Sequence, residues 1–252
     1  MRSKIARNTF TALAAGLLFG ACTSNGTDSG GISGGSSSGG GLANDGTTPT
    51  NITDGGTPLS GHFICTQAST FYGDVTTQVG SNGLVGGPLT ALLNLLGATT
   101  LTQLLNSITN ANNVIDGNLD TYASASLTVG LLGGLLSSVD ESVLLPSGVT
   151  VPAGKYAVYG VSFPKGTVSL GLFNTVKVST YLNNVQQDSN TLNQSALALL
   201  GAVGGSTPAT AFIGIKASKP YDRATISLTP GLLSVNVGEA MRIHELCVDG
   251  TL

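Results

Sequence analysis

The chain has 252 residues, of which 10 are Lys or Arg and 13 are Asp or Glu, so its formal net charge is −3. Only 9% of the residues are charged, aromatic residues make up 5%, and there is no Trp. Without a basic stripe, this composition gives no support to nucleic-acid binding. The 36 glycines and the low charge are typical of an extracellular all-β module with many turns.

Residues 1–21 have the three parts of a secretory signal peptide. Three basic residues open the segment, an apolar stretch follows at 10–19, and two small residues precede Cys22. The apolar stretch is shorter than the about 20 residues that a membrane-spanning helix needs. Small residues before a cysteine resemble a bacterial lipobox, which implies that Cys22 carries a diacylglycerol anchor in the membrane. The alternative is an ordinary cleaved signal peptide with an incidental cysteine.

Residues 22–60 are rich in Gly, Ser and Thr and contain no aromatic residue. Such a segment has too little apolar surface to offset the entropy of ordering. We therefore expect a lipidated cysteine followed by a flexible tether, with a single domain at 61–252. The expected location is the bacterial cell envelope. Thr23 is not the Asp that typically retains lipoproteins at the inner membrane, so in a Gram-negative cell we expect the anchor in the outer membrane.

The domain at 61–252 contains many short stretches of alternating or β-rich sequence. Proline and glycine turns such as PSG, PAG, PKG and TPG separate them. This pattern predicts an all-β fold, an antiparallel β-sandwich. The expected strands lie at 62–69, 121–131, 141–146, 155–163, 167–173, 175–182, 211–218, 223–229 and 241–248.

Two leucine-rich segments have helical rather than strand spacing. Residues 88–108 repeat leucine every three or four positions with an interruption at Gly97, and Pro88 suits a first helical turn. Residues 191–203 predict a second short helix. We expect these helices to cover the ends of the sandwich, and the alternative is a surface that binds a membrane or a partner.

The three cysteines divide by position. Cys22 belongs to the expected anchor, which leaves Cys65 and Cys247 near the two ends of the domain. In an oxidising compartment an isolated pair indicates a disulfide, which requires the first and last strands to be neighbours. Because His62 and His244 each precede a cysteine by three residues, a Cys₂His₂ zinc site is the alternative. Side chains three apart on a strand point to opposite faces, which disfavours zinc.

The segment NNVIDGNLDTYAS at 112–124 is the strongest candidate site. Its Asp116, Asn118 and Asp120 match the start of an EF-hand loop, but Thr121 replaces the required glycine and Leu127 the bidentate Glu. An EF-hand is therefore excluded.

The same segment resembles the Asp-Gly loop of discoidin (F5/8 type C) domains and related galactose-binding-like modules. The closing stretch AMRIHELCVDG resembles their last strand. The resemblance implies a β-jelly-roll sandwich and a structural Ca²⁺ held by Asp116, Thr121 and Glu245. Ca²⁺ binds six to eight hard oxygens, which carboxylates and turn carbonyls supply. The alternative is a turn at Asp116-Gly117 without a metal.

We expect no catalytic residues. Asp116 and Asp120 are carboxylates of the type used in glycoside hydrolysis, but so close to a strand such residues usually make local hydrogen bonds. The two G-x-S-x-G matches, at 31–35 and 35–39, lie in the expected tether. With only two histidines, a Ser-His-Asp arrangement is not expected.

The sequence therefore predicts a non-catalytic envelope module that binds a glycan or another surface component. The alternative is a structural or adhesive protein that associates with other proteins. Sugar sites stack aromatic rings on the sugar, and the rings available are Phe71, Tyr72, Tyr122, Tyr156, Tyr159 and Tyr181.

Overall fold

The computed structural model describes residues 42, 46–81, 97–127, 138–164, 167, 173–200, 210–231 and 237–252. The chain divides into two compact units, 1–38 and 39–252, and all described residues belong to the second. Within these residues no helix is both long and apolar enough to cross a membrane. Residues 1–41, which include Cys22, lie outside the described part of the chain.

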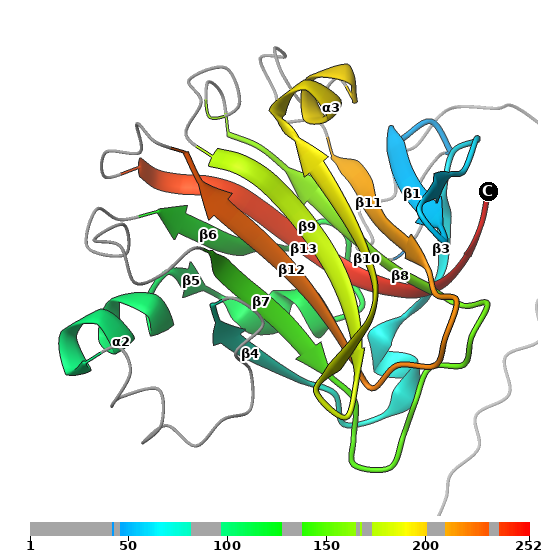
Figure 1. The fold of residues 1–252 in the computed structure, drawn as a ribbon, viewed down its shortest axis with the longest axis horizontal. Helices are drawn as coiled ribbons and strands as arrows, with labels where there is room; N and C mark the ends of the chain where they lie inside the picture. Colours follow the sequence, from blue (N-terminus) through cyan, green and yellow to red (C-terminus); the bar gives the residue numbers. More distant parts are fainter. Residues whose placement is uncertain are drawn as a thin grey trace, which may run out of the picture. The chain divides into compact units, whose positions relative to one another are not determined.

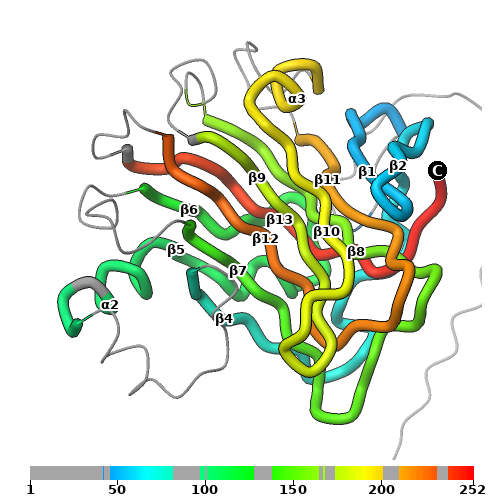
Figure 2. Tube along the Cα trace, in the orientation of Figure 1, coloured from blue at the N-terminus to red at the C-terminus, as the bar shows by residue number. Residues whose placement is uncertain are grey.

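Two β-sheets form the second unit (Figures 1 and 2). The larger sheet has the order β2 (Thr57–Pro58), β1 (Thr50–Asp54), β11 (Ala211–Lys216), β8 (Tyr156–Ser162), β13 (Val237–Thr251), β6 (Ala123–Leu127) and β5 (Ile108–Thr109), and β3 (Ile64–Ala68) also pairs with β13. The smaller sheet has the order β10 (Val185–Asn193), β9 (Phe173–Leu182), β12 (Arg223–Pro230), β7 (Val139–Leu144) and β4 (Thr76–Gly80). The predicted all-β sandwich is confirmed, although β1 pairs with β11 in parallel.

The alternation along β8 shows why these sequences form strands. Ala157, Tyr159 and Val161 point into the core between the sheets, whereas Val158 joins a second apolar cluster with Phe212. Side chains alternate between the faces of a strand, so β8 is buried on both sides. Its nearly continuous apolar sequence follows from this double burial.

The folded unit begins earlier than the sequence predicts. Residues 50–54 were expected in the tether, but they form β1, whose Ile52 is fully buried in the second cluster. The side-chain nitrogen of Asn190 on β10 donates to Oδ1 of Asn51 and to the carbonyl of Gly214, both at 3.0 Å. These bonds tie the smaller sheet to the edge of the larger one, so residues 46–60 belong to the domain.

The helices are shorter than the leucine spacing predicts. The helix expected at 88–108 is present as α2 (Ala98–Leu105), which begins directly after Gly97, where φ is +74°. The one expected at 191–203 is present as α3 (Gln194–Leu199), and Asn193 Oδ1 caps it by accepting from the Ala196 N–H at 2.9 Å. Residues 82–96 and 201–209 lie outside the described residues. Two 3₁₀ turns, η1 (Ser69–Tyr72) and η2 (Ala111–Ile115), complete the fold.

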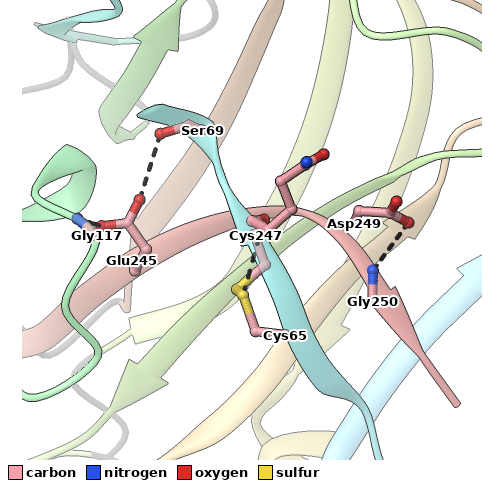
Figure 3. The surroundings of a disulfide bond; sticks show 8 residues. Cys65, Ser69, Gly117, Glu245, Cys247, Asp249 and Gly250 are labelled. Carbon is pink, nitrogen blue, oxygen red and sulfur yellow. Dashed lines mark hydrogen bonds between the residues drawn. A yellow bond between two sulfur atoms is a disulfide. The ribbon is translucent and has the colours of Figure 1, made fainter. Parts of the chain in front are cut away.

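The predicted disulfide is confirmed. Cys65 on β3 and Cys247 on β13 are bonded, with their Cα atoms 5.7 Å apart (Figure 3). The bond joins residues 182 positions apart and keeps β3 beside the last strand. Because both sulfurs are oxidised, they do not act as thiolate ligands, and the zinc alternative is wrong. His62 instead lies 3.2 Å from the Thr48 carbonyl.

Candidate functional site

The Asp-Gly loop runs from η2 to β6 and lies against the last strand. A β-bulge in β13 between Ile243 and Leu246 places one extra residue opposite β8. A bulge changes the direction in which the side chains of its residues point. Here it carries His244 and Glu245, and both contact the loop. The site therefore joins segments that are about 125 residues apart in the chain.

The loop itself is held by short polar bonds. Asp116 accepts the Asn118 N–H on Oδ1 at 3.0 Å and the Thr121 hydroxyl on Oδ2 at 2.7 Å. The Thr121 hydroxyl also lies 3.0 Å from the Asn118 carbonyl. Gly117 adopts φ of +77°, which glycine tolerates at no steric cost. The local sequence thus closes a tight turn with two loop oxygen groups, Asp116 and Thr121, on one side.

Glu245 is fully buried and points its carboxylate at the loop (Figure 3). Its Oε2 accepts the Gly117 N–H at 2.8 Å, and its Oε1 accepts the Ser69 hydroxyl at 3.3 Å. Burial raises the pKa of Glu245 to about 8, opposed by the Gly117 N–H and reinforced by the nearby Asp116 carboxylate. Two carboxylates therefore lie close enough to influence each other, one from the loop and one from the last strand.

The neighbouring His244 holds the other end of the loop. Its Nδ1 lies 2.8 Å from the Leu119 carbonyl, which can only accept, so this nitrogen carries the proton. Its Nε2 then accepts the Ser162 hydroxyl at 2.9 Å. Burial lowers the pKa of His244, which favours the neutral ring. His244 therefore acts as a clamp that holds the loop against β13 through the Leu119 carbonyl.

The structure brings together the three residues that the resemblance implies as calcium ligands. Asp116 contacts Thr121 directly, and Glu245 bonds to Gly117, the residue after Asp116. For Asp120 the backbone N–H donates to Asn118 Oδ1, which is a local bond of the kind expected for a turn. Two residues that contact this site, Ser69 and His244, are not predicted from the sequence as parts of it. The bulge and the 3₁₀ turn that position them leave no pattern in the sequence.

The described residues contain a Ser–His pair, although its third partner differs from that of a Ser-His-Asp arrangement. Ser162 and His244 are in hydrogen-bond contact, as a nucleophile and its base would be. Both are buried, with 3% and 6% of their surface exposed, and the third partner is a backbone carbonyl, that of Leu119, rather than a carboxylate. This geometry closes the pair to a substrate and gives it a structural role.

Three of the six candidate aromatic rings are already engaged. Arg242 stacks over Tyr122 at 4.4 Å, and Arg223 stacks over Tyr181 at 4.0 Å. Tyr159 is fully buried and donates to the Ala224 carbonyl. These rings are therefore not free platforms for a ligand.

Phe71 is the candidate ring with the largest exposure. It is 66% exposed on η1, two residues after Ser69, and packs edge-to-face against Tyr72 with the ring centres 5.3 Å apart. Tyr156 is half-buried and packs against Phe63. An exposed aromatic ring thus lies in the same short turn that contacts Glu245.

No family model and no curated protein matches this chain. Among solved structures, one similar chain is the family 32 carbohydrate-binding module of C. perfringens NanJ in complex with galactose. It is 14% identical, with a TM-score of 0.35, over 70% of this chain and 94% of that one. Another is the lectin domain of lectinolysin complexed with Lewis B antigen, 12% identical, with a TM-score of 0.37, over 74% and 99%. Both are galactose-binding-like β-sandwiches and match this chain only in part.

Proposed function

We propose that this chain is a non-catalytic binding module of the bacterial cell envelope, with a calcium ion bracing the Asp-Gly loop. Its ligand would be a glycan or another surface component. One observation carries the proposal: Glu245, which lies 124 residues beyond Thr121 on the bulged last strand, accepts the Gly117 N–H in the turn where Asp116 bonds to Thr121.

The donor set fits calcium. Within the described residues no three or more His, Cys, Asp or Glu side chains gather as a metal site, so the ligands would be two carboxylates, a hydroxyl and loop carbonyls. All of these are hard oxygens. Each of the four side-chain oxygens of Asp116 and Glu245 accepts a hydrogen bond and has a second lone pair that can face a cation. A bound ion would offset the repulsion between the two carboxylates.

Thermal unfolding tests the metal. Calcium at about 100 times its dissociation constant should stabilise the fold by about 2.7 kcal/mol, which corresponds to a rise in Tm of roughly 5 to 10 °C. The rise should vanish in Asp116→Ala and in Glu245→Ala. Asp120→Ala is the matched control, because it removes a carboxylate from the same loop outside the ligand set. An unchanged Tm on adding calcium to the native chain would exclude the metal.

The lipid anchor is a separate part of the proposal. A cysteine that carries diacylglycerol anchors a chain to the bilayer without spanning it. Cys22→Ala should therefore shift the protein from the membrane fraction of cells to the soluble fraction. Retention of the variant in the membrane fraction would count against lipidation at Cys22.

Binding of a surface glycan is tested on a glycan array, with and without calcium. The proposal expects saturable binding to at least one glycan, weakened when calcium is chelated and in Glu245→Ala. A non-catalytic module would leave the bound glycan chemically intact, which mass spectrometry of the recovered glycan checks. Cleavage of the glycan, lost in Asp116→Asn, would instead indicate an enzyme.

A second candidate is a structural or adhesive protein that associates through apolar surface. The observation that favours it is the exposure of leucines at the ends of the two short helices, 88% for Leu199 on α3 and 43% for Leu105 on α2. Replacing both with Gln should abolish self-association or capture of an envelope protein. A glycan that binds equally well to this variant would favour the first function.

A further inference from the structure

A polar pocket of about 270 Å³ lies at the end of the sandwich where β7, β9 and β12 meet their loops. Three connections form it, and Figure 1 shows them together at the lower end of these strands: the β7–β8 loop, the β9–β10 turn and the β11–β12 loop. The lining residues are Leu144, Leu145, Pro146, Ser147, Gly148, Asn183, Asn184, Asp222 and Arg223. None of them belongs to the Asp-Gly loop site.

The wall of this pocket is held in place by hydrogen bonds between two connections. Asp222 accepts the Asn183 N–H on Oδ2 at 2.8 Å, and its own N–H donates to the Tyr181 carbonyl at 2.8 Å. Asn183 and Asn184 have φ of +50° and +66°, the conformation of a two-residue type I′ hairpin turn. The pocket is therefore preorganised, and a ligand would not have to order it.

Charge in the pocket is balanced. Arg223 is only 4% exposed, stacks on Tyr181 and donates from Nη1 to Asn184 Oδ1 at 3.0 Å. The carboxylate of Asp222 lies close enough to raise the pKa of Arg223, although burial, the larger effect, lowers it. One cation and one anion line the pocket, and the other lining residues are neutral. This balance favours a neutral ligand over an anion or a cation.

The polar groups that remain match hydroxyl groups. A guanidinium only donates, so the Asn184 atom that it contacts is the oxygen, and the amide nitrogen of this lining residue is left as a donor. Asp222 Oδ1 remains an acceptor, and the exposed Ser147 hydroxyl both donates and accepts. Leu145 and Pro146 add an apolar wall. A sugar ring carries adjacent hydroxyls that donate and accept, together with apolar C–H faces.

We propose that this pocket binds a single neutral, polyhydroxylated ring, such as one unmodified sugar residue of a surface glycan. Its volume falls just below the roughly 300 to 1,000 Å³ of pockets for drug-sized ligands, which suits a ligand of this smaller size. The inference rests on the proposed glycan-binding function and adds a location to it.

The test is a titration of the full chain, followed by NMR chemical shifts, with methyl glycosides of galactose, glucose and mannose and with N-acetylglucosamine. Glucuronate and inorganic phosphate are the anionic probes. We expect at least one neutral probe to bind with a Kd in the millimolar range or tighter. Both anionic probes should bind at least tenfold more weakly.

Two variants connect the binding to the pocket. Ser147→Tyr fills the pocket from an exposed position, and Asn184→Gly removes the amide while glycine keeps the positive φ that the turn needs. Each should weaken the binding of the neutral probe at least tenfold, with little change in Tm. Thr150→Tyr is the matched control, because Thr150 is exposed in the same loop and does not line the pocket. This control should bind as the native chain does.

Three results would overturn the inference. If no probe binds, or if phosphate or glucuronate binds more tightly than every neutral probe, the ligand class is wrong. If a neutral probe binds equally well to Ser147→Tyr and Asn184→Gly, glycan binding stands but occurs elsewhere on the chain. The proposed function fails separately, when the array shows no glycan bound at all.

Discussion

Glu245 and Glu141 are both fully buried glutamates, yet their surroundings differ. Burial raises the pKa of each to about 8. Glu245 accepts bonds from Gly117 and Ser69, whereas within the described part of the chain neither side-chain oxygen of Glu141 has a hydrogen-bond partner. Hydrogen-bond donors stabilise a charged carboxylate, and among the described residues Glu245 has such donors whereas Glu141 does not. The comparison separates a carboxylate in the proposed calcium site from a polar group enclosed in the core.

The position of Glu141 explains its isolation. It lies on β7 between Val139 and Val143, which both point into the core. Across the ladder it pairs with Val79 on β4 and Ile226 on β12. These neighbours offer no donor side chain. Glu245 differs because a bulge and two turns, rather than regular strands, surround it.

The largest expected effect on stability comes from the disulfide, which joins β3 to β13, the strand that carries Glu245. Replacing Cys65 and Cys247 together with alanine should lower the free energy of unfolding by about 3 to 5 kcal/mol, because the bond closes a long loop in the unfolded chain. It should also weaken the calcium response, since β3 leads into Ser69. Chemical denaturation measures the first effect. A loss below about 1 kcal/mol would show that β3 stays in place without the bond.

The next effect concerns pH. Burial raises the pKa of both Glu141 and Glu245 to about 8, so the folded chain keeps their protons up to that pH, while the unfolded chain releases them near the usual glutamate pKa of 4.5. The unfolded state therefore binds fewer protons between these values, so stability in the absence of calcium should fall as pH rises from about 5 to 8. Glu141→Gln should reduce this fall, measured by urea unfolding at several pH values. An equally steep fall in the variant would show that Glu141 is not the neutral, enclosed group described.

A smaller effect compares the two glutamates directly at pH 8. Glu245→Ala leaves the Gly117 N–H without its acceptor and should cost about 1 to 3 kcal/mol of unfolding free energy. Glu141→Met replaces an unpartnered carboxyl with an apolar side chain of similar size and should be neutral or stabilise by about 1 kcal/mol. A large loss in Glu141→Met would mean that this carboxyl has a structural partner.

Much of the fold could be predicted from the sequence, and the missed strands share a cause. β8 and β13 are rich in apolar residues because both of their faces are covered. β1 and β10 lie near sheet edges and bury few apolar side chains, among them Ile52 and Leu192. Because so few of their residues are apolar and buried, the sequence of β1 resembles a tether and the sequence of β10 resembles a polar loop.

The candidate site could be predicted only in part. The resemblance named Asp116, Thr121 and Glu245, and the structure places them around one turn. The clamp of His244 depends on a bulge, and the pocket at Asn184 and Asp222 on three separate connections. Such features arise from tertiary packing, and no local spacing of residues encodes them.

The most direct test of the calcium-braced loop is calorimetric titration of Ca²⁺ into the chelator-treated full chain at pH 7.5. The native chain and Glu141→Gln should each bind one ion, and Glu245→Gln, which keeps the size of the side chain but removes its charge, should bind at least tenfold more weakly. Equal calcium affinity in Glu245→Gln and the native chain, or no binding by either, would contradict the account.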